Sequence, residues 1–331
     1  TGALVTGNTV VMKPAEQSSV IAAHLMAMMK EVGFPTDVCQ FLPGYGEEVG
    51  QRLIEHADVD IIAFTGSKEV GTHILKTSTE LNPNQKYIKK CVIEMGGKNA
   101  LIVDSDADLD EAVQGLIYSA FGFQGQKCSA CSRAIILESN YGRFIARFIE
   151  AVSSIDILSA EDPQAFLGPV VDLEAYEKIC GMIERAKSYS KLAYQGEAPK
   201  GGFFIPPTVF VDVPEDSELA QEEVFGPVLA VLKVKNMDEA IRVANNTRYG
   251  LTGGIYSRSP ENIKKASREV KVGNFYVNRS ITGAIVERHP FGGFKMSGLG
   301  SKTGGPDYLK QFMDPRVVTE NTMRRGFAPE N

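Results

Sequence analysis

The feature that most constrains the fold is an alternation of short apolar runs with longer amphipathic stretches. Four runs in the first hundred residues have the length and β-branched content of strands: Asn8–Lys13, Val38–Leu42, Val59–Phe64 and Tyr87–Glu94. Helical spacing separates them, as between Ser18 and Val32, a helix that Gly33 and Pro35 end. We expect the methionines of that helix to fill the core. Strands and helices that alternate in this way imply a parallel sheet with helices on both faces.

The same alternation continues beyond residue 100 and predicts a second α/β domain. Its expected strands are Ala100–Val103, Ala134–Leu137, Val209–Val213, Val228–Val234, Gly254–Ser257 and Asn274–Asn278. The helices expected among them include Tyr141–Val152, Asp172–Lys187, Asp238–Thr247 and Pro260–Val270. Glycine-rich turns follow from Ser297, and Arg316–Thr319 is a candidate strand that pairs elsewhere.

Composition is that of a globular protein and argues against some classes of partner. Apolar residues make up 43% of the 331 residues, and charged residues 23%. The net charge of −6 gives no basic footprint for nucleic acid, and no apolar run approaches the roughly 20 residues of a membrane span. Five cysteines without framework spacing indicate a reducing compartment, so we expect a cytoplasmic protein.

One cysteine has the surroundings of a reactive thiol. Cys128 lies in the stretch FGFQGQKCSACSR, beside Lys127 and close to Arg133. Nearby positive charge lowers the pKa of a thiol, so Cys128 is a candidate nucleophile. The stretch alone leaves open an inert cysteine, a redox pair with Cys131, and a hydrolase nucleophile served by one of the four histidines. Zinc is disfavoured, because no second pair of ligands has the required spacing.

Glycine-rich turns after two expected strands are candidate phosphate sites. The turn Gly44-x-Gly46-x-x-x-Gly50 is one residue longer than the dinucleotide fingerprint and is therefore weak evidence. Gly66 and Ser67 lead into a helix, where backbone N–H groups and the helix dipole favour a phosphate. A simple N-cap by Ser67 is an equal alternative.

A carboxylate also stands where α/β proteins bind ligands. Glu94 ends an expected strand and precedes Met95-Gly96-Gly97-Lys98. Open α/β sheets bind ligands at the carboxyl ends of their strands, and paired glycines allow a sharp turn or a close approach. Glu94 is therefore a candidate site residue, with an ordinary surface glutamate as the alternative.

Seven motifs taken together resemble the aldehyde dehydrogenase superfamily. In chain order they are NTVVMKPAE, FTGSKEVG, IEMGGKN, GQKCSACSR, EEVFGPV, NNTRYGLTGGIYS and PFGGFKMSGLG. The resemblance implies an α/β fold with part of a Rossmann-type cofactor domain and an α/β catalytic domain. The expected boundaries are 1–95 for the cofactor part, 96–296 for the catalytic domain, and 297–331 for a return segment and oligomerisation tail.

The resemblance implies roles for individual residues. Cys128 would attack an aldehyde to give a thiohemiacetal and then a thioester, with its own N–H donating to the oxyanion. Glu94 would activate the water that hydrolyses the thioester. The implied cofactor is NAD, since an acidic Glu16 disfavours a 2′-phosphate. The contacts expected for it are Lys13 and Glu16 at the adenosine ribose, Gly66 and Ser67 at the pyrophosphate, and Glu223 and Phe225 at the nicotinamide end; no metal is implied.

Within the superfamily, the chain is most similar to the 1-pyrroline-5-carboxylate dehydrogenase branch, which oxidises L-glutamate γ-semialdehyde. Lys127 and Ser129 around the nucleophile, together with Thr282–Ala284, carry this likeness. It implies that the Ser129 hydroxyl and the N–H groups of Gly283 and Ala284 hold the substrate α-carboxylate, while Phe291 packs on its methylenes. An ordinary loop at Thr282–Ala284 is the alternative.

The family has a further stretch before the position of Thr1, with the first strands of the cofactor domain and an asparagine that supplies a second oxyanion donor. We interpret the chain as part of such an enzyme, which would be a homo-oligomer when intact. The alternatives are a catalytically silent chain that binds NAD or pairs with other chains, and a dehydrogenase for another small semialdehyde.

Overall fold

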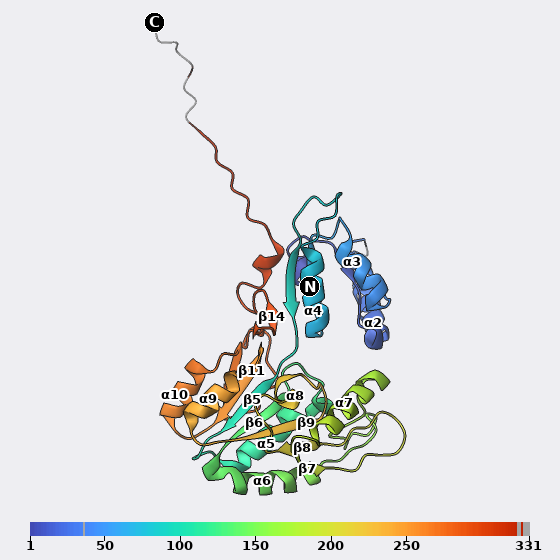
Figure 1. Cartoon of the computed structure of the whole chain (residues 1–331). Coiled ribbons are helices and arrows are strands. Elements are labelled where there is room, and N and C mark those ends of the chain that lie inside the picture. The colour runs from blue at the N-terminus through green and yellow to red at the C-terminus, as the bar shows by residue number, and fades with distance from the viewer. Residues whose placement is uncertain (36, 323–325, 327–331) are drawn as a thin grey trace.

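The computed structural model describes residues 1–35, 37–322 and 326. Its largest element is a seven-stranded sheet in the order β12-β11-β5-β6-β9-β8-β7, in which only the edge pair β7–β8 is antiparallel (Figure 1). The strands are β5 (Asn99–Val103), β6 (Cys131–Leu137), β7 (Lys191–Gln195), β8 (Thr208–Val211), β9 (Val228–Val234), β11 (Thr252–Tyr256) and β12 (Asn274–Val277).

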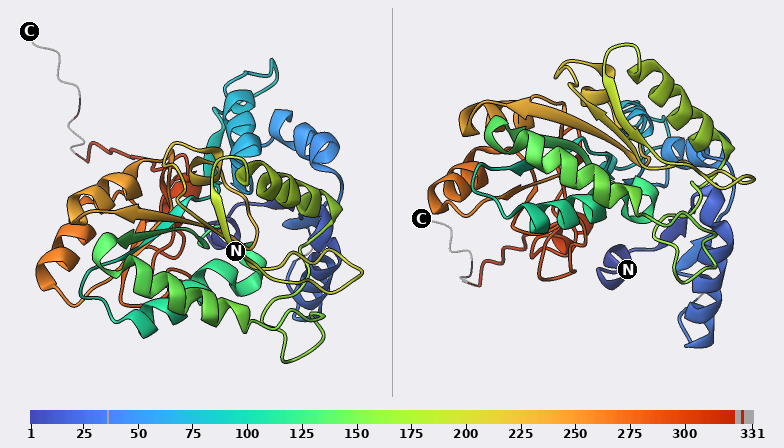
Figure 2. Two further views of the ribbon diagram at one scale, coloured as in Figure 1. Left: turned by 60° about the horizontal axis from the view of Figure 1, so that its bottom comes forward. Right: turned by 90° about the horizontal axis from the view of Figure 1, so that it is seen from below.

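Helices cover both faces of this sheet because its central strands are apolar on both sides. In β5, Ala100 and Ile102 pack into one core cluster, and Leu101 and Val103 pack into the other. The first face carries α7 (Leu173–Ala186), α8 (Glu218–Gln221), α9 (Met237–Asn245) and α10 (Pro260–Glu269). The second carries α5 (Leu109–Phe121) and α6 (Glu138–Ser153) (Figure 2). The predicted α/β fold is confirmed.

A three-stranded sheet stands beside the large one and contains both early and late parts of the chain (Figure 1). The strands β3 (Ile61–Thr65) and β4 (Lys90–Glu94) are parallel, with α4 (Lys68–Ser78) between them. The short strand β14 (Gly298–Leu299) pairs antiparallel with the end of β4. The chain therefore returns to its first hundred residues, although the exact domain boundaries stay a prediction.

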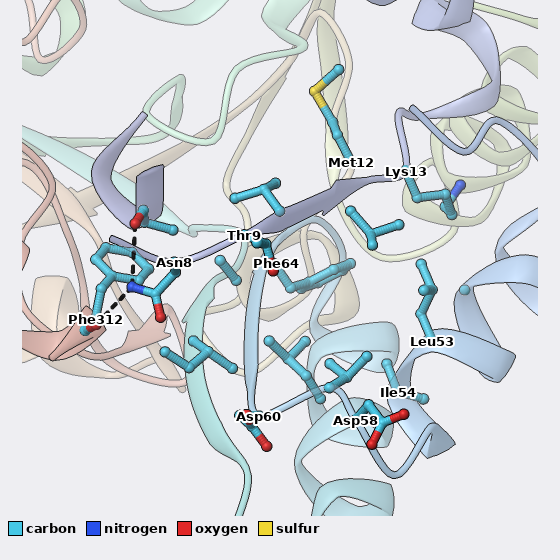
Figure 3. Close-up of a pocket in the computed structure, with 18 residues that line it drawn as sticks. Asn8, Thr9, Met12, Lys13, Leu53, Ile54, Asp58, Asp60, Phe64 and Phe312 are labelled. Atoms are coloured by element: carbon cyan, nitrogen blue, oxygen red, sulfur yellow. Dashed lines mark hydrogen bonds between the residues drawn. The ribbon is translucent and has the colours of Figure 1, made fainter. Parts of the chain in front are cut away.

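The first two strands form a separate parallel pair, β1 (Val10–Met12) and β2 (Cys39–Phe41). A cavity of about 450 Å³ lies between β1 and β3, with Lys13 toward one end and the Asn8–Phe312 hydrogen bond at the other (Figure 3). Around this pair lie α1 (Gly2–Val5), η1 (Glu16–Ser18), α2 (Ser19–Glu31), the π-helical turn η2 (Gly46–Gly50) and α3 (Gln51–Glu55).

Several predictions of local structure were wrong. The helix α2 has no buried residue, and Met28 is 56% exposed, so its methionines do not fill the core. The strand β7 was missed, as was the pair β10 (Tyr249–Gly250) and β13 (Phe294–Lys295). Residues 316–319 form no strand within this chain and extend away from the body (Figure 1), so their pairing elsewhere stays a prediction. The remaining elements are η3 (Gly122–Gly125) and η4 (Leu309–Phe312).

No helix among residues 1–35 and 37–322 combines the length and the apolar content needed to cross a membrane.

Candidate active site

The two candidate catalytic residues lie where the two larger sheets adjoin. Glu94 is the last residue of β4, and the chain then turns through four residues into β5 at Asn99. Cys128 lies three residues before β6, whose first residue, Cys131, pairs in register with Asn99. The carboxyl end of one sheet and the amino ends of two strands of the other therefore meet around Cys128, which explains how residues distant in sequence share one site.

Hydrogen bonds from two residues that the sequence analysis did not single out fix the backbone around Cys128. The Asn99 side-chain amide donates to the carbonyl oxygens of Cys128 at 2.7 Å and of Ala130 at 2.8 Å. Its own oxygen accepts from the N–H of Thr252 at 2.9 Å, and the Thr252 hydroxyl donates to the carbonyl of Ser129 at 3.3 Å. Asn99 is the last residue of the IEMGGKN motif, and its place in that motif was the sequence feature that could have identified it as a site residue.

The expectation that basic neighbours lower the pKa of Cys128 was wrong. Burial, followed by the charges of Glu223 and Glu94, raises the pKa of the Cys128 thiol to about 11. Lys127 places its Nζ over the ring of Phe123, at 5.5 Å from the centroid. The other expected cation, Arg133, is buried and donates to three backbone carbonyls. The resting thiol is therefore protonated at neutral pH.

Glu94 has the properties of a base that works near neutral pH. Burial raises the pKa of its carboxyl group to about 7, although the N–H of Gly293 and the charge of Lys302 act in the opposite direction. One carboxyl oxygen, Oε2, is buried and has no hydrogen-bond partner among the described residues. Two glycines leave room for the carboxyl group, since a Cβ on Gly292 or Gly298 would lie 2.9 or 3.2 Å from one of its oxygens.

Glu223 is held against the glycine turn between Glu94 and β5. Its Oε1 accepts from the N–H of Gly97 at 3.0 Å, and a Cβ on Gly96 would lie only 1.9 Å from Oε2. This close approach explains the paired glycines of the motif. Burial raises the pKa of Glu223 as well. Phe225, two residues later, has a left-handed backbone (φ 56°) and a ring that is 40% exposed.

The residues expected at the adenosine end also lie together. Lys13 donates from Nζ to Glu16 at 2.9 Å and to the carbonyl of Gly44 at 3.0 Å. The hydrogen bond from Lys13 lowers the pKa of Glu16. The glycine turn at Gly44 and Gly46 thus packs on the predicted ribose residues, and Gly46 lies beside the Glu16 carboxylate.

Gly66 and Ser67 join the end of β3 to α4. The Ser67 hydroxyl accepts from the N–H of Val70 at 3.2 Å, so the N-cap alternative describes the structure. The N–H of Gly66 donates to the carbonyl of Glu94 at 3.1 Å, and a Cβ there would meet the ring of Phe64 at 2.4 Å. A pyrophosphate contact at these residues stays a prediction.

The residues expected to bind substrate are less closely connected by direct contacts. Ser129 is buried next to the nucleophile. Gly283 adopts φ +79°, and the base of its loop is tied to α5 because the N–H of Ile281 donates to Ser119 at 3.1 Å. Phe291 is held by a two-way backbone bridge to Thr303. The anchoring of a carboxylate by Ser129, Gly283 and Ala284 stays a prediction.

The structure gives little support to the redox alternative. All five cysteines are free. Cys131 is 1% exposed, and its burial raises the pKa of the thiol to about 12, so it is a poor partner for thiol exchange. In the described part of the chain, no three His, Cys, Asp or Glu residues are arranged to hold a metal ion.

Comparison with known proteins decides the family. The sequence model of the aldehyde dehydrogenase family matches residues 1–318. The chain belongs to the aldehyde dehydrogenase family.

Among members of this family, the chain is similar to 1-pyrroline-5-carboxylate dehydrogenases and to a proline utilization A protein. The 1-pyrroline-5-carboxylate dehydrogenase of Geobacillus kaustophilus is 47% identical over 318 residues, and the match covers 96% of this chain and 62% of that protein. A crystal structure of a 1-pyrroline-5-carboxylate dehydrogenase from Thermus with bound NAD superimposes with a TM-score of 0.92 and 47% identity, covering 95% of this chain and 61% of the other. Proline utilization A from Bdellovibrio bacteriovorus gives a TM-score of 0.96 at 62% identity, covering all of this chain and 34% of that one. The chain thus spans about three fifths of the dehydrogenases that it matches.

Two buried basic residues, Lys98 and Arg133, support the backbone of the candidate site. Lys98 and Arg133 are 1% and 2% exposed. Burial and the charge of Arg133 lower the pKa of Lys98 to about 7, and its Nζ has no hydrogen-bond partner in the part of the chain that the structure describes. The Nε of Arg133 donates to the carbonyl of Lys98 at 3.0 Å, so the arginine fixes the turn that holds Glu223. The sequence analysis assigned neither residue this role.

Proposed function

We propose that the chain is the larger part of an NAD-dependent dehydrogenase that oxidises L-glutamate γ-semialdehyde, in equilibrium with 1-pyrroline-5-carboxylate, to L-glutamate. The observation that carries the proposal is the meeting of Cys128 and Glu94 at one sheet junction, close enough for the Glu94 charge to raise the pKa of the thiol. The likeness to 1-pyrroline-5-carboxylate dehydrogenases supports the substrate class. Such a reaction would belong to the breakdown of proline and arginine.

The geometry suits a two-stage reaction at Cys128. The Cys128 sulfur attacks the aldehyde carbon while its proton passes to Glu94. Because the pKa of Glu94, about 7, lies below that of the thiol, about 11, this transfer is unfavourable by itself and is coupled to formation of the carbon–sulfur bond. The backbone N–H of Cys128 donates to the oxygen that becomes negative. After hydride loss the carbon is a thioester, and Glu94, having released its proton to solvent, deprotonates the water that hydrolyses it. L-Glutamate leaves, and the thiol is restored.

The residues present fit a bound dinucleotide. A cradle at Gly96 and Gly97 already holds the Glu223 carboxylate, which can accept hydrogen bonds from ribose hydroxyls. At the other end the Glu16 carboxylate can act as an acceptor, and it is held in place by Lys13, whose Nζ donates to Glu16 and to the carbonyls of Pro14 and Gly44. When bound, NAD supplies the hydride acceptor for the reaction. The negative charge of Glu16 favours NAD over NADP, because a 2′-phosphate would be repelled.

The proposed substrate anchor explains why a semialdehyde with an α-carboxylate would be preferred. Ser129, Gly283 and Ala284 would donate to that carboxylate, and Phe291 would pack on the methylenes. A plain aldehyde would leave these donors without a partner in a partly buried site, which costs free energy. We further propose that the intact enzyme is a homo-oligomer.

The test is the appearance of NADH when the purified chain receives NAD and 1-pyrroline-5-carboxylate, with NADP and propanal as comparisons. We expect turnover that prefers the first pair and is lost in both Cys128→Ser and Glu94→Gln. Substantial turnover in either variant would contradict the assigned roles. The second candidate, a silent chain that still binds NAD, is favoured by the three-fifths span and predicts binding without turnover. Joining the remaining part of a relative to the chain should then restore activity.

A further inference from the structure

An ion pair joins the helix of the three-stranded sheet to a loop of the seven-stranded sheet. Lys68, the first residue of α4, donates from Nζ to Oε2 of Glu222 at 2.9 Å. Glu222 directly follows α8, which packs on the large sheet. The bond therefore connects two segments that belong to different sheets and lie far apart in the sequence.

The pair is sheltered from solvent on the lysine side. The Lys68 side chain is 14% exposed, and its Nζ lies 5.4 Å from the ring centroid of Tyr249, a buried residue. Burial lowers the pKa of Lys68, but the hydrogen bond to Glu222 and the nearby Tyr249 outweigh this effect and leave the pKa raised. A charge-assisted hydrogen bond in such a place is stronger than one between exposed side chains. The pair can therefore fix the separation of the two segments.

The position of the pair suggests what the fixed separation is for. Lys68 follows Ser67, the expected pyrophosphate residue, and Glu222 precedes Glu223, the expected nicotinamide-ribose residue. We propose that Lys68 and Glu222 are positioning residues that hold these two ends of the cofactor site at the separation that NAD requires. The inference rests on the proposed NAD binding. It gives a role to Lys68 and Glu222, which have none in the proposed reaction.

The physical reason is preorganisation. A dinucleotide that contacts both segments gains affinity when the protein does not have to order them on binding. A ligand that reaches only the adenosine end, near Lys13 and Glu16, gains nothing from the pair. The ratio of the two affinities therefore reports on the pair, whereas a general loss of folding would weaken both ligands.

The experiment compares the dissociation constants of NAD and AMP by calorimetric titration of the purified chain. In Glu222→Gln we expect the constant for NAD to rise about tenfold, as for the loss of a hydrogen bond to a charged group, with that for AMP unchanged. Lys68→Met should raise the constant for NAD at least as much, since it also removes a positive charge beside the expected pyrophosphate residue. Lys68→Arg should retain most of the affinity. The matched control is Glu218→Gln, which breaks the Arg185–Glu218 pair at 2.9 Å on the neighbouring helix and makes the same change of charge. It should leave both constants unchanged.

Hydrogen exchange of the protein without NAD gives a second readout. In Glu222→Gln, the first turn of α4 and residues 222–226 should exchange faster than in wild type, and Glu218→Gln should not show this change. Equal exchange and equal NAD affinity in Glu222→Gln and wild type would overturn the proposal. Tighter NAD binding by Glu222→Gln would also overturn it, since Glu222 would then compete with the cofactor for Lys68. A wild-type chain that binds neither NAD nor AMP refutes the proposed function, and the exchange result then decides whether the pair holds the segments.

Discussion

Replacing Glu94 by glutamine tests the surroundings of this carboxyl group in the resting protein, independently of any cofactor. Burial raises its pKa from 4.5 to about 7. A difference of about 2.5 units corresponds to about 3.4 kcal/mol at about 1.36 kcal/mol per unit. Because the side chain is only half-buried, solvent screening reduces the expected value to about 2 kcal/mol.

The direction of the pH dependence follows from the folded chain binding the Glu94 proton more tightly than the unfolded chain does. Below pH 4.5 Glu94 is protonated in both the folded and the unfolded chain. As the pH rises toward 7 the unfolded chain loses the proton first, so the free energy of unfolding falls, and it stays lower above pH 7. Glutamine does not titrate and has nearly the shape of the protonated acid. The stability of Glu94→Gln relative to wild type should therefore grow by about 2 kcal/mol between pH 4.5 and pH 8.

The assay is urea unfolding of both proteins at several pH values across this range. Only the change of the difference with pH is interpreted, because any constant offset reflects altered packing of the amide. Glu16→Gln is a control of opposite sign: the hydrogen bond from Lys13 lowers the pKa of Glu16, so its carboxylate stabilises the fold above its unfolded pKa and loses this effect as the pH falls through the folded value. A stability difference between Glu94→Gln and wild type that does not vary with pH would refute the argument.

Three further predictions concern the surroundings of the nucleophile. The rate at which iodoacetamide labels Cys128 should rise from about pH 7 to about pH 10, because burial beside Glu223 keeps the thiol protonated, whereas Cys131 should stay unlabelled. Peptide mass spectrometry measures the labelling, and a rate for Cys128 that levels off below about pH 8 would contradict this prediction. Asn99→Ala should lower the free energy of unfolding by about 2–3 kcal/mol, because its buried amide makes three hydrogen bonds; a loss below about 0.5 kcal/mol in urea unfolding would count against this. Gly96→Ala should weaken NAD binding about tenfold, since the added Cβ would lie 1.9 Å from Glu223 Oε2; unchanged affinity in a titration would show that the cradle is not needed.

Much of the fold could be predicted because the signals are local. In β9, alternate residues enter opposite cores, so the run Val228–Val234 is apolar except for Lys233 and is recognisable as a buried strand. Asp108 accepts hydrogen bonds from the N–H groups of Asp110 and Glu111 at the start of α5, an N-cap that depends only on neighbouring residues. Cys128, Glu94 and the glycine turn after Glu94 could be proposed as site residues for the same reason, since each belongs to a short motif.

The parts that could not be predicted depend on contacts between distant segments. The strand β7 is an edge strand with only three apolar residues, Leu192–Tyr194, all of them partly buried, so Lys191–Gln195 carries only a weak signal. The two-residue strand β14 exists only because Glu94 and its neighbour offer a free edge. The exposure of α2 is likewise a tertiary property, because its apolar residues would be equally compatible with a covered helix.

The pKa of Cys128 also depends on residues that are distant in sequence and could not be predicted from its neighbours in the chain. The cations next to it in sequence face elsewhere, whereas the groups next to it in space are the carboxylates Glu94 and Glu223. With a pKa of about 11, roughly one thiol in ten thousand is ionised at pH 7. In the reaction that we propose, so small a thiolate fraction favours an attack in which the proton leaves as the bond to the aldehyde forms. Glu94, with a pKa of about 7, would be the acceptor, which would give the carboxylate a task in the first stage of the proposed reaction as well as in the second.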